Sequence, residues 1–428
     1  QMNVTGTIGD RVKLGVSYNT DASFEFENKT KIEYEGDEDD IVRKIEAGNV
    51  TLPLPGTLIT GSQSLFGIKT ELQFGKLNVT TVLSQQKGQT QVVEVQGGAQ
   101  VTPFEITSTE YEANKHFFLG HSFRGNFDKA HKSLPQITSP ITITKIEVWV
   151  TNKTRGKVED VRPVYAFTDL GETNPSVLSN AASLQIAPNN TGWPSNGANT
   201  LYNIVKTPVS NRDDESLRTL GLVDGRDYDK TQSARKLTSS EYSVDTKLGY
   251  ISLNMSLNND EVLGVAYEYM VNGYTYKVGD LSTEVTSSKT PLVLKLLKGT
   301  TLSPKLSTWD LMMKNIYNLN AYEISKDDFY LNVLYHDNKN GSDVSYIPEP
   351  AGRIDSIALL KFLGLDNTNS QMNGNSDGVF DFIDGVTIDK RYGRVIFPML
   401  EPFGRGLRDR FIKRGVTDSL TWSKYTYY

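Results

Sequence analysis

The stretch that decides the fold is Ser23-Phe-Glu-Phe-Glu-Asn-Lys-Thr-Lys-Ile-Glu-Tyr-Glu35, in which two kinds of side chain alternate. A period of two places them on opposite faces of one β-strand. One face is charged, and the other carries aromatic residues near both ends. Such a strand is typical of an outer-membrane barrel, between lipid and a wet lumen, and also of a soluble sandwich. Taken alone, the strand favours the soluble alternative, because Asn28 and Thr30 stand where lipid would favour Leu or Val.

Three neighbouring segments alternate in the same way: residues 12–18, 66–74 and 77–84, the last two joined by the turn Gly75-Lys76. Strands of roughly ten residues joined by short polar turns are the sequence pattern of a barrel wall. Residues 37–46 predict a short helix, because the first turn is acidic, two isoleucines share one face and a glycine follows as a stop. The N-terminal part is therefore predicted to be an antiparallel sheet that can face a membrane.

The composition describes a polar, β-rich chain of 428 residues, with 37% hydrophobic residues, 35 Gly and 21 Tyr and a mean hydropathy of -0.40. With a net charge of -6 the chain has no excess of basic residues, so a nucleic-acid partner is not expected. The absence of cysteine excludes disulfides, Cys-rich zinc sites and thiol catalysis. No run approaches the ~18 apolar residues of a membrane helix. Because the chain runs from Gln1 straight into a strand, we expect an internal piece of a longer protein, or one whose leader was removed.

The chain changes character between residues 99 and 140, where an aromatic segment contains His116 and His121. These histidines are five residues apart, which suits neither a helical metal pair nor one face of a strand. We expect them to have a packing role. His131 and His336 stand in no arrangement that resembles a catalytic triad.

Beyond Pro140 the sequence predicts a mixed, β-rich domain with a few short helices. Residues 141–151 are apolar on both faces, as in a buried strand, and residues 169–242 are rich in loops. Asn272-Gly273 between two alternating runs predicts a β-hairpin. Residues 307–322 predict a helix with a capping box and an apolar stripe of core residues, and residues 355–363 predict a second helix that stops at Gly364.

One loop has the spacing of a calcium site. Carboxylate, amide and carbonyl oxygens stand at positions one, three, five, seven, nine and twelve of a twelve-residue loop, and Gly378 stands at position six. The predicted ligands are Asn373, Asn375, Asp377, the Val379 carbonyl, Asp381 and Asp384. The first ligand is Asn and the last is the short Asp, and no amphipathic helices clearly flank the loop, so it is not an EF-hand. The alternative interpretation is a turn rich in Asn and Asp that serves backbone geometry, and a bound Ca²⁺ would be structural.

Several blocks, in order along the chain, resemble the SprA/Sov family of outer-membrane proteins. They are residues 46–49 (EAGN), 61–67 (GSQSLFG), 116–119 (HFFL), 146–152 (IEVWVTN), 221–228 (GLVDGRDY), 262–267 (VLGVAY), 309–317 (WDLMMKNIY), 377–383 (DGVFDFI) and 393–403 (GRVIFPMLEPF). The resemblance implies a very large β-barrel, the translocon of the type IX secretion system, which passes folded cargo to the cell surface and in some members serves gliding motility. It also implies secreted cargo proteins, a lipidated-cargo shuttle barrel, a periplasmic plug protein and outer-membrane lipid as partners. It provides no catalytic residues.

With this resemblance the fold class becomes mainly β: antiparallel transmembrane β-barrel wall strands plus a large inserted β-rich (α+β) soluble domain. We expect residues 1–110 to be a wall segment, 111–140 a connection, 141–410 the inserted domain and 411–428 a return toward the wall. Since long insertions of such barrels lie outside, the inserted domain is expected at the cell surface, where it caps or gates the pore.

Two other classes stay open. A soluble glycan-binding sandwich would use Trp149 and Trp193 as stacking platforms. A hydrolase with paired carboxylates is the weaker alternative, because no motif places such a pair.

Overall fold

The structure is a computed structural model that describes residues 2–9, 11–18, 29–37, 40–53, 62–84, 103–153, 161–179, 184–206, 214–285, 287–327, 329–338, 340–348, 357–369 and 373–426. It divides into two compact units, Gln1–Val101 and Thr102–Tyr428. They are called the N-terminal and the C-terminal unit, and each is described by itself.

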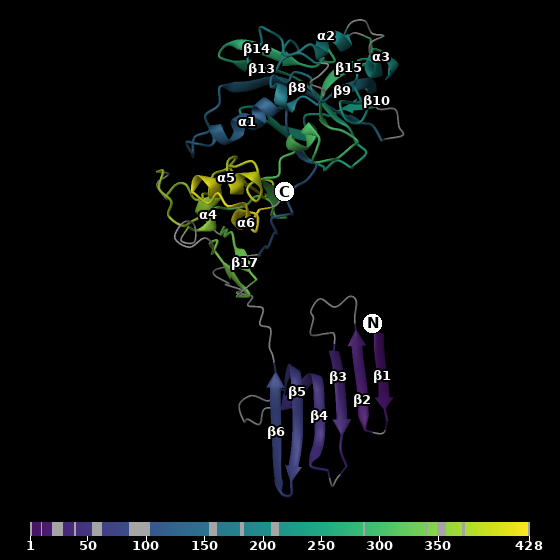
Figure 1. Ribbon diagram of the computed structural model, residues 1–428, viewed down its shortest axis with the longest axis vertical. Coiled ribbons are helices and arrows are strands. Elements are labelled where there is room, and N and C mark those ends of the chain that lie inside the picture. The colour runs from purple at the N-terminus through teal and green to yellow at the C-terminus, as the bar shows by residue number, and fades with distance from the viewer. Residues whose placement is uncertain are drawn as a thin grey trace. The chain divides into compact units, whose positions relative to one another are not determined.

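The N-terminal unit is a sheet of six antiparallel strands in which neighbours in the sequence are neighbours in the sheet (Figure 1). The strands are β1 (Met2–Ile8), β2 (Val12–Tyr18), β3 (Lys29–Glu35), β4 (Val42–Pro53), β5 (Ser62–Phe74) and β6 (Leu77–Ser84). The predicted strands at 12–18, 66–74 and 77–84 are confirmed. Residues 29–35 of the deciding stretch form β3, and residues 23–28 lie outside the described part of the chain. Among the described residues of this unit the strand pairings do not close into a barrel.

The helix predicted for residues 37–46 is wrong. Its second half is the start of β4, which pairs with β5 from Val42 to Pro53 and with β3 from Lys44 to Gly48. Asp37 and Asp40 belong to the loop before β4, where the Arg11 guanidinium pairs with both carboxylates. The four-residue spacing of the isoleucines fits a helix, but pairing with two neighbouring strands supplies more backbone hydrogen bonds than one isolated turn, so tertiary context prevails.

The C-terminal unit contains a small closed barrel of five strands: β8 (Ile141–Thr151), β9 (Val161–Phe167), β10 (Tyr228–Lys236), β13 (Leu263–Val271) and β15 (Leu292–Lys298). The ring runs β8-β13-β15-β9-β10 and closes on β8. The β9–β15 pair is parallel and the other pairs are antiparallel. The predicted strand at 141–151 is therefore confirmed.

Side chains fill the inside of this barrel, and all five strands contribute to them. They include Trp149, Val164, Ala166, Ala234, Ala266, Leu292, Leu294 and Leu296. Gly264 is required at the centre, because a Cβ there would lie 3.1 Å from Leu294 Cδ1 and 3.3 Å from Ala166 Cβ. The barrel is thus a packed core and not a channel.

The predicted hairpin is confirmed: β14 (Tyr274–Val278) pairs with β13 on the outside of the ring. Asn272 and Gly273 have φ angles of 49° and 83°. Two consecutive positive φ values are what a two-residue hairpin turn of type I′ needs.

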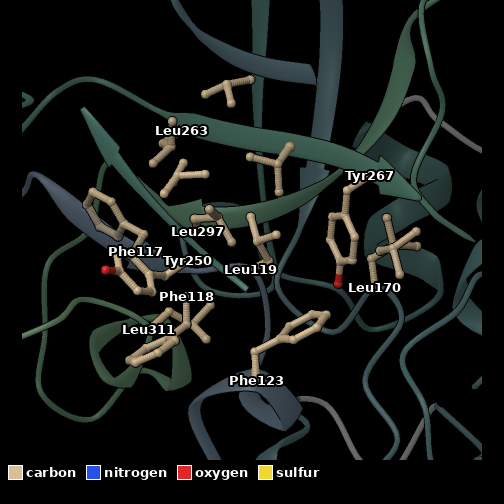
Figure 2. Close-up of a cluster of buried hydrophobic side chains, with 14 of the residues drawn as sticks. Phe117, Phe118, Leu119, Phe123, Leu170, Tyr250, Leu263, Tyr267, Leu297 and Leu311 are labelled. Atoms are coloured by element: carbon tan, nitrogen blue, oxygen red, sulfur yellow. The ribbon is translucent and has the colours of Figure 1, made fainter. Parts of the chain in front are cut away.

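A second layer covers one side of the barrel. It consists of β7 (His116–Phe118), α1 (His121–Ala130), α2 (Leu201–Lys206), α3 (Asp214–Thr219), β11 (Tyr242–Asp245), β12 (Tyr250–Leu253) and the short turn η2 (Pro175–Val177). Figure 2 shows Phe117 and Phe118 of β7 and Phe123 of α1 in one buried cluster with Leu263 and Tyr267 of β13. β13 thus alternates between this core and the barrel interior. Residues 111–140, expected as a connection, supply β7 and α1 to this core.

The rest of the unit forms another core, of which Leu363, Ile388 and Phe411 are fully buried members. Its elements are β16 (Ile316–Asn318), β17 (Tyr335–Asp337), β18 (Ser342–Val344), α4 (Leu359–Phe362), β19 (Ile388–Asp389), β20 (Arg394–Ile396), α5 (Arg405–Lys413) and α6 (Ser419–Trp422). The short helix η4 (Ser307–Asp310) packs instead against the core around β7 and α1 through Trp309. The described residues beyond 410 contain helical and irregular segments, and the return of 411–428 toward a wall stays a prediction.

The helix predicted for residues 307–322 is wrong, although its apolar stripe is buried. Only η4 is helical, and β16 pairs with β20 instead. The backbone between them bonds to β7, since Phe118 N donates to Leu311 O and Met313 N donates to His116 O. Of the second predicted helix, residues 355 and 356 lie outside the described part of the chain; within residues 357–363 only α4 is helical, and Gly364 with a φ of 81° comes shortly after it.

Candidate functional site: a sheet with two unlike faces

The N-terminal sheet has one apolar face that stays exposed. The registers place Ile32, Ile68 and Leu83 in one row across β3, β5 and β6. Leu83 is 72% exposed and Ile68 is 50% exposed. Other exposed apolar residues on the same face are Ile8, Phe74, Leu77 and Val79. Water does not favour so many large apolar side chains side by side, so the face requires an apolar neighbour.

The opposite face carries a ladder of ion pairs across β3, β4 and β5. Its members are Lys31, Glu33, Lys44, Glu46, Lys69 and Glu71. Glu46 lies at the centre, with its carboxylate 2.6 Å from Lys31 Nζ, 3.2 Å from Lys44 Nζ and 3.8 Å from Lys69 Nζ. Because three lysines alternate with three glutamates, the net field of this face is small, and the central Glu46, which is 5% exposed, is buried among its lysine partners.

The predicted calcium ligands are directed to separate partners. Asp381 accepts from Thr368 N at 3.2 Å and from Asn367 N at 2.5 Å, so it ties the loop to the backbone just after α4. Asp377 accepts from Val379 N at 3.1 Å, and Asp384 accepts from Lys390 N at 3.2 Å. The three carboxylates therefore stabilise local turns, which favours the alternative interpretation of this loop.

The other predicted ligands lie in the same loop. Asn373 N donates to Asn369 Oδ1, Asn375 N donates to the Asn373 carbonyl, and the Val379 side chain is 59% exposed. Within the described residues no three His, Asp or Glu side chains gather as a metal site. Calcium binding here stays a prediction; titration calorimetry at millimolar Ca²⁺ would detect heat if the loop binds it and none if it is only a turn.

A buried polar network missed from the sequence surrounds His116, which is 1% exposed. Its Nδ1 lies 2.7 Å from Ser252 Oγ and its Nε2 lies 2.8 Å from Glu112 Oε2. Arg394 Nε lies 2.6 Å from the same carboxylate oxygen. Burial acts to raise the pKa of Glu112, but hydrogen bonds from His116 and Lys115 outweigh it and lower the pKa to about 2. Since Arg394 belongs to β20 and Ser252 to β12, the network joins two of the cores.

A second buried network holds a lysine inside the core against the barrel. Lys295 is 1% exposed, and its Nζ lies 2.7 Å from Glu172 Oε1. It also donates to the Thr168 carbonyl, while His121 N donates to Glu172 at 3.2 Å. Burial acts to raise the pKa of Glu172, but Lys295 outweighs it and the pKa is lowered. A buried charge of this kind survives only when paired.

The candidate stacking platform Trp149 is 1% exposed inside the barrel, so a glycan cannot reach it. Trp193 is half-buried against the core around β7 and α1. Among the helices that the structure describes, none is long and apolar enough to span a membrane.

Comparison with protein families now adds to this geometry. A model described as motility related/secretion protein matches residues 3–262, which is more than half of the chain. The chain belongs to the SprA family. A search of curated proteins finds no match. Membership shows a motility- or secretion-related protein and agrees with a location in the cell envelope. The SprA match covers all six strands of the N-terminal sheet and continues to the residue before β13.

Proposed function

We propose that the N-terminal sheet is a section of the wall of a large outer-membrane β-barrel, the translocon that passes folded cargo proteins to the cell surface. The observation that carries the proposal is the pairing of an exposed apolar face with a charged ladder on the other face. Lipid is the apolar neighbour that the first face requires, and a water-filled lumen suits the second.

The ladder suits the passage of folded proteins. Apolar groups exposed on the wall would bind apolar patches of the cargo and hold it in the pore. Paired charged side chains stay hydrated and do not hold cargo in this way. The mixed sign also avoids strong attraction to cargo of one charge. Both edge strands, β1 and β6, have only one strand neighbour within the described residues, so the sheet can continue on both sides. These features support a wall segment over a sandwich, whose apolar face would be covered.

In this proposal the C-terminal unit caps or gates the pore at the cell surface, and secreted cargo, a lipidated-cargo shuttle barrel and a periplasmic plug protein are the partners. The filled barrel supports a gating or capping role over a conducting one, because its interior has no passage.

The test uses cysteines, of which the chain has none. Ile68→Cys and Lys69→Cys are neighbours on β5 that face opposite ways, and Ile32→Cys with Glu33→Cys repeats the pair on β3. In the intact protein in outer membranes, a water-soluble maleimide should label the Lys69 and Glu33 variants and leave the two Ile variants unlabelled until the membrane is dissolved in detergent. The unsubstituted protein gives the background. Equal labelling within each pair, before detergent, would contradict the wall proposal.

A further inference from the structure

A basic hollow lies in the C-terminal unit between α4 and α5. Its volume is about 230 Å³, and its lining consists of Ile357, Lys361, Phe362, Arg410, Lys413 and Arg414. Four of these six residues are cations, in a chain whose net charge is -6. The hollow therefore gathers one sign of charge against the overall balance of the molecule.

These cations differ from the other basic residues of α5. Arg405 is paired with Glu401 and Arg408 with Asp409. Within the described chain no carboxylate lies within ion-pair distance of Lys361, Lys413 or Arg414, and all three are exposed. Their charges thus stay available at the mouth of the hollow.

Arg410 is the fixed member of the group. Its Nη1 donates to the Phe362 carbonyl at 2.6 Å, which ties α5 to the end of α4. Burial lowers the pKa of Arg410, and the positive charge of the neighbouring Arg414 lowers it further. The negative charge of Asp128 acts in the opposite direction and raises that pKa. A guanidinium held in this way presents its remaining N–H groups in a set direction.

Helix ends explain only part of the arrangement. Cations in the last turn of a helix interact favourably with its dipole, and Arg410 and Lys413 both belong to the last turn of α5. Lys361 belongs to α4, whose four residues make only a weak dipole, and Arg414 follows the last residue of α5. The helix dipole therefore does not explain why cations of both α4 and α5 line the same hollow.

A second hollow of about 320 Å³ shares Ile357, Lys361 and Arg414 with the first. Its other lining residues are Ala358, Asp366, Ser376 and Gly378. Asp366 is buried and accepts from Asp377 N and Gly378 N, both at 3.0 Å, so its carboxylate is already engaged with the loop that the sequence marked as a calcium site. Lys361 and Arg414 stand between the two hollows, where they can contact a group that extends from one into the other.

We propose that this pair of hollows is a binding site for a phosphate-bearing ligand, with the phosphate held by Lys361, Arg410, Lys413 and Arg414. Guanidinium forks match phosphate oxygens, and lysines add charge to them. Ile357 and Phe362 provide apolar contact for the carbon part of the ligand, and the second hollow has room for a polar extension. A phosphorylated lipid headgroup and a free phosphorylated metabolite share this chemistry.

The first experiment titrates the whole chain with inorganic pyrophosphate by calorimetry at low salt. The double variant Lys413→Gln/Arg414→Gln should weaken binding by at least about tenfold, since it removes two charge-assisted contacts. The control Lys132→Gln/Lys289→Gln makes the same change of charge at two exposed lysines elsewhere and should bind as the unsubstituted chain does. The charge-conserving Lys413→Arg/Arg414→Lys should retain binding. Lys361→Gln, on the other helix, gives a second reading if the double variant does not fold.

The source of the phosphate is distinguished with vesicles. More flotation with phosphatidylcholine vesicles that contain phosphatidic acid than with phosphatidylcholine alone, with the difference lost in Lys413→Gln/Arg414→Gln, would support a lipid headgroup. Binding of pyrophosphate with equal flotation on both kinds of vesicle would support a soluble ligand. The proposal is overturned if neither probe binds, or if the control variant loses as much affinity as the Lys413 and Arg414 variant. The maleimide test of the sheet is independent of either outcome.

Discussion

The two units solve the problem of an apolar strand face in opposite ways. In the C-terminal barrel β13 is covered on both faces, since Gly264 and Ala266 face a filled interior and Tyr267 faces the core around α1. In the N-terminal sheet the apolar face of β3, β5 and β6 is exposed, and the other face is covered only by its own ion pairs. The barrel thus buries its apolar side chains within its own unit, whereas the described chain leaves one apolar face of the sheet uncovered.

The largest expected effect comes from the buried pair of the C-terminal unit. Lys295→Met leaves Glu172 buried without its lysine, which should lower the free energy of unfolding by about 4 kcal/mol. All four tryptophans, at 149, 193, 309 and 422, lie in this unit, so tryptophan fluorescence during urea unfolding reports on it. The double variant Lys295→Met/Glu172→Gln should recover a substantial part of the loss. A single variant as stable as the unsubstituted chain would contradict the inference that this pair holds the core.

Acid should weaken the C-terminal unit through Glu112. Its folded pKa of about 2 lies below the ordinary value of 4.5, so its contribution is full above pH 4.5 and is lost as the pH falls toward 2. Glu112→Gln should cost about 2 kcal/mol at pH 7, allowing for solvent screening, and almost nothing near pH 2. Urea unfolding across that pH range measures the difference. A constant gap between the two chains would mean that the charge of Glu112 is not what stabilises the network.

Glycines sharpen the contrast between a filled and an open face. Gly264→Ala places a methyl group against Leu294 and Ala166 inside the barrel, which should destabilise the C-terminal unit by about 1.5 kcal/mol. Gly15→Ala in β2 meets no atom within 4 Å, so it should leave stability unchanged or raise it by about 0.5 kcal/mol. Thermal unfolding, followed by fluorescence for the first and by far-UV circular dichroism for the second, separates the two. Equal losses of stability in the two variants would contradict the inferred difference in packing between the barrel interior and the open face of β2.

The smallest effect is expected in the ion-pair ladder. Lys31→Gln removes one of three lysines beside Glu46, and Lys44 and Lys69 remain. The Lys31 side chain is 38% exposed and two lysines still flank the buried Glu46 carboxylate, so the loss should be about 1 kcal/mol or less. Circular dichroism of the sheet during urea unfolding should therefore show a small shift, and a shift as large as that of Lys295→Met would show that Lys44 and Lys69 do not compensate for the lost charge.

The sequence predicted the fold well in those segments whose residue pattern fits only one kind of secondary structure. Alternation predicted β2, β5 and β6, a run that is apolar on both faces predicted β8, and Asn272-Gly273 predicted the β13–β14 hairpin, because these signals are local. The two helix predictions at 37–46 and 307–322 were wrong, since the same spacing of apolar residues fits a segment held by distant strands. The closed ring could not be predicted, because no local sequence pattern shows that β15 pairs with β9.

Only one part of the candidate site, the two faces of the N-terminal sheet, could be predicted from the sequence. The two faces of the sheet follow from alternation and were foreseen, whereas the charged side chains at Glu112, Glu172 and Lys295 become partners only through the fold. The basic hollow did leave a signal in the sequence. Residues 405–414 (RGLRDRFIKR) contain five cations and one acid in an otherwise acidic chain, and that local excess could have indicated an anion site.

The order of strands in the N-terminal sheet has a consequence for how each unit forms. From β1 to β6 every strand pairs with the one just before it, so each hairpin can be added as soon as it is synthesised. The C-terminal barrel must wait, because its ring closes only when β15 reaches β9, and Leu292 pairs with Val164 far earlier in the chain. Local pairing is fast and distant pairing is slow. The sheet can therefore grow strand by strand, while the barrel has to fold in one late step.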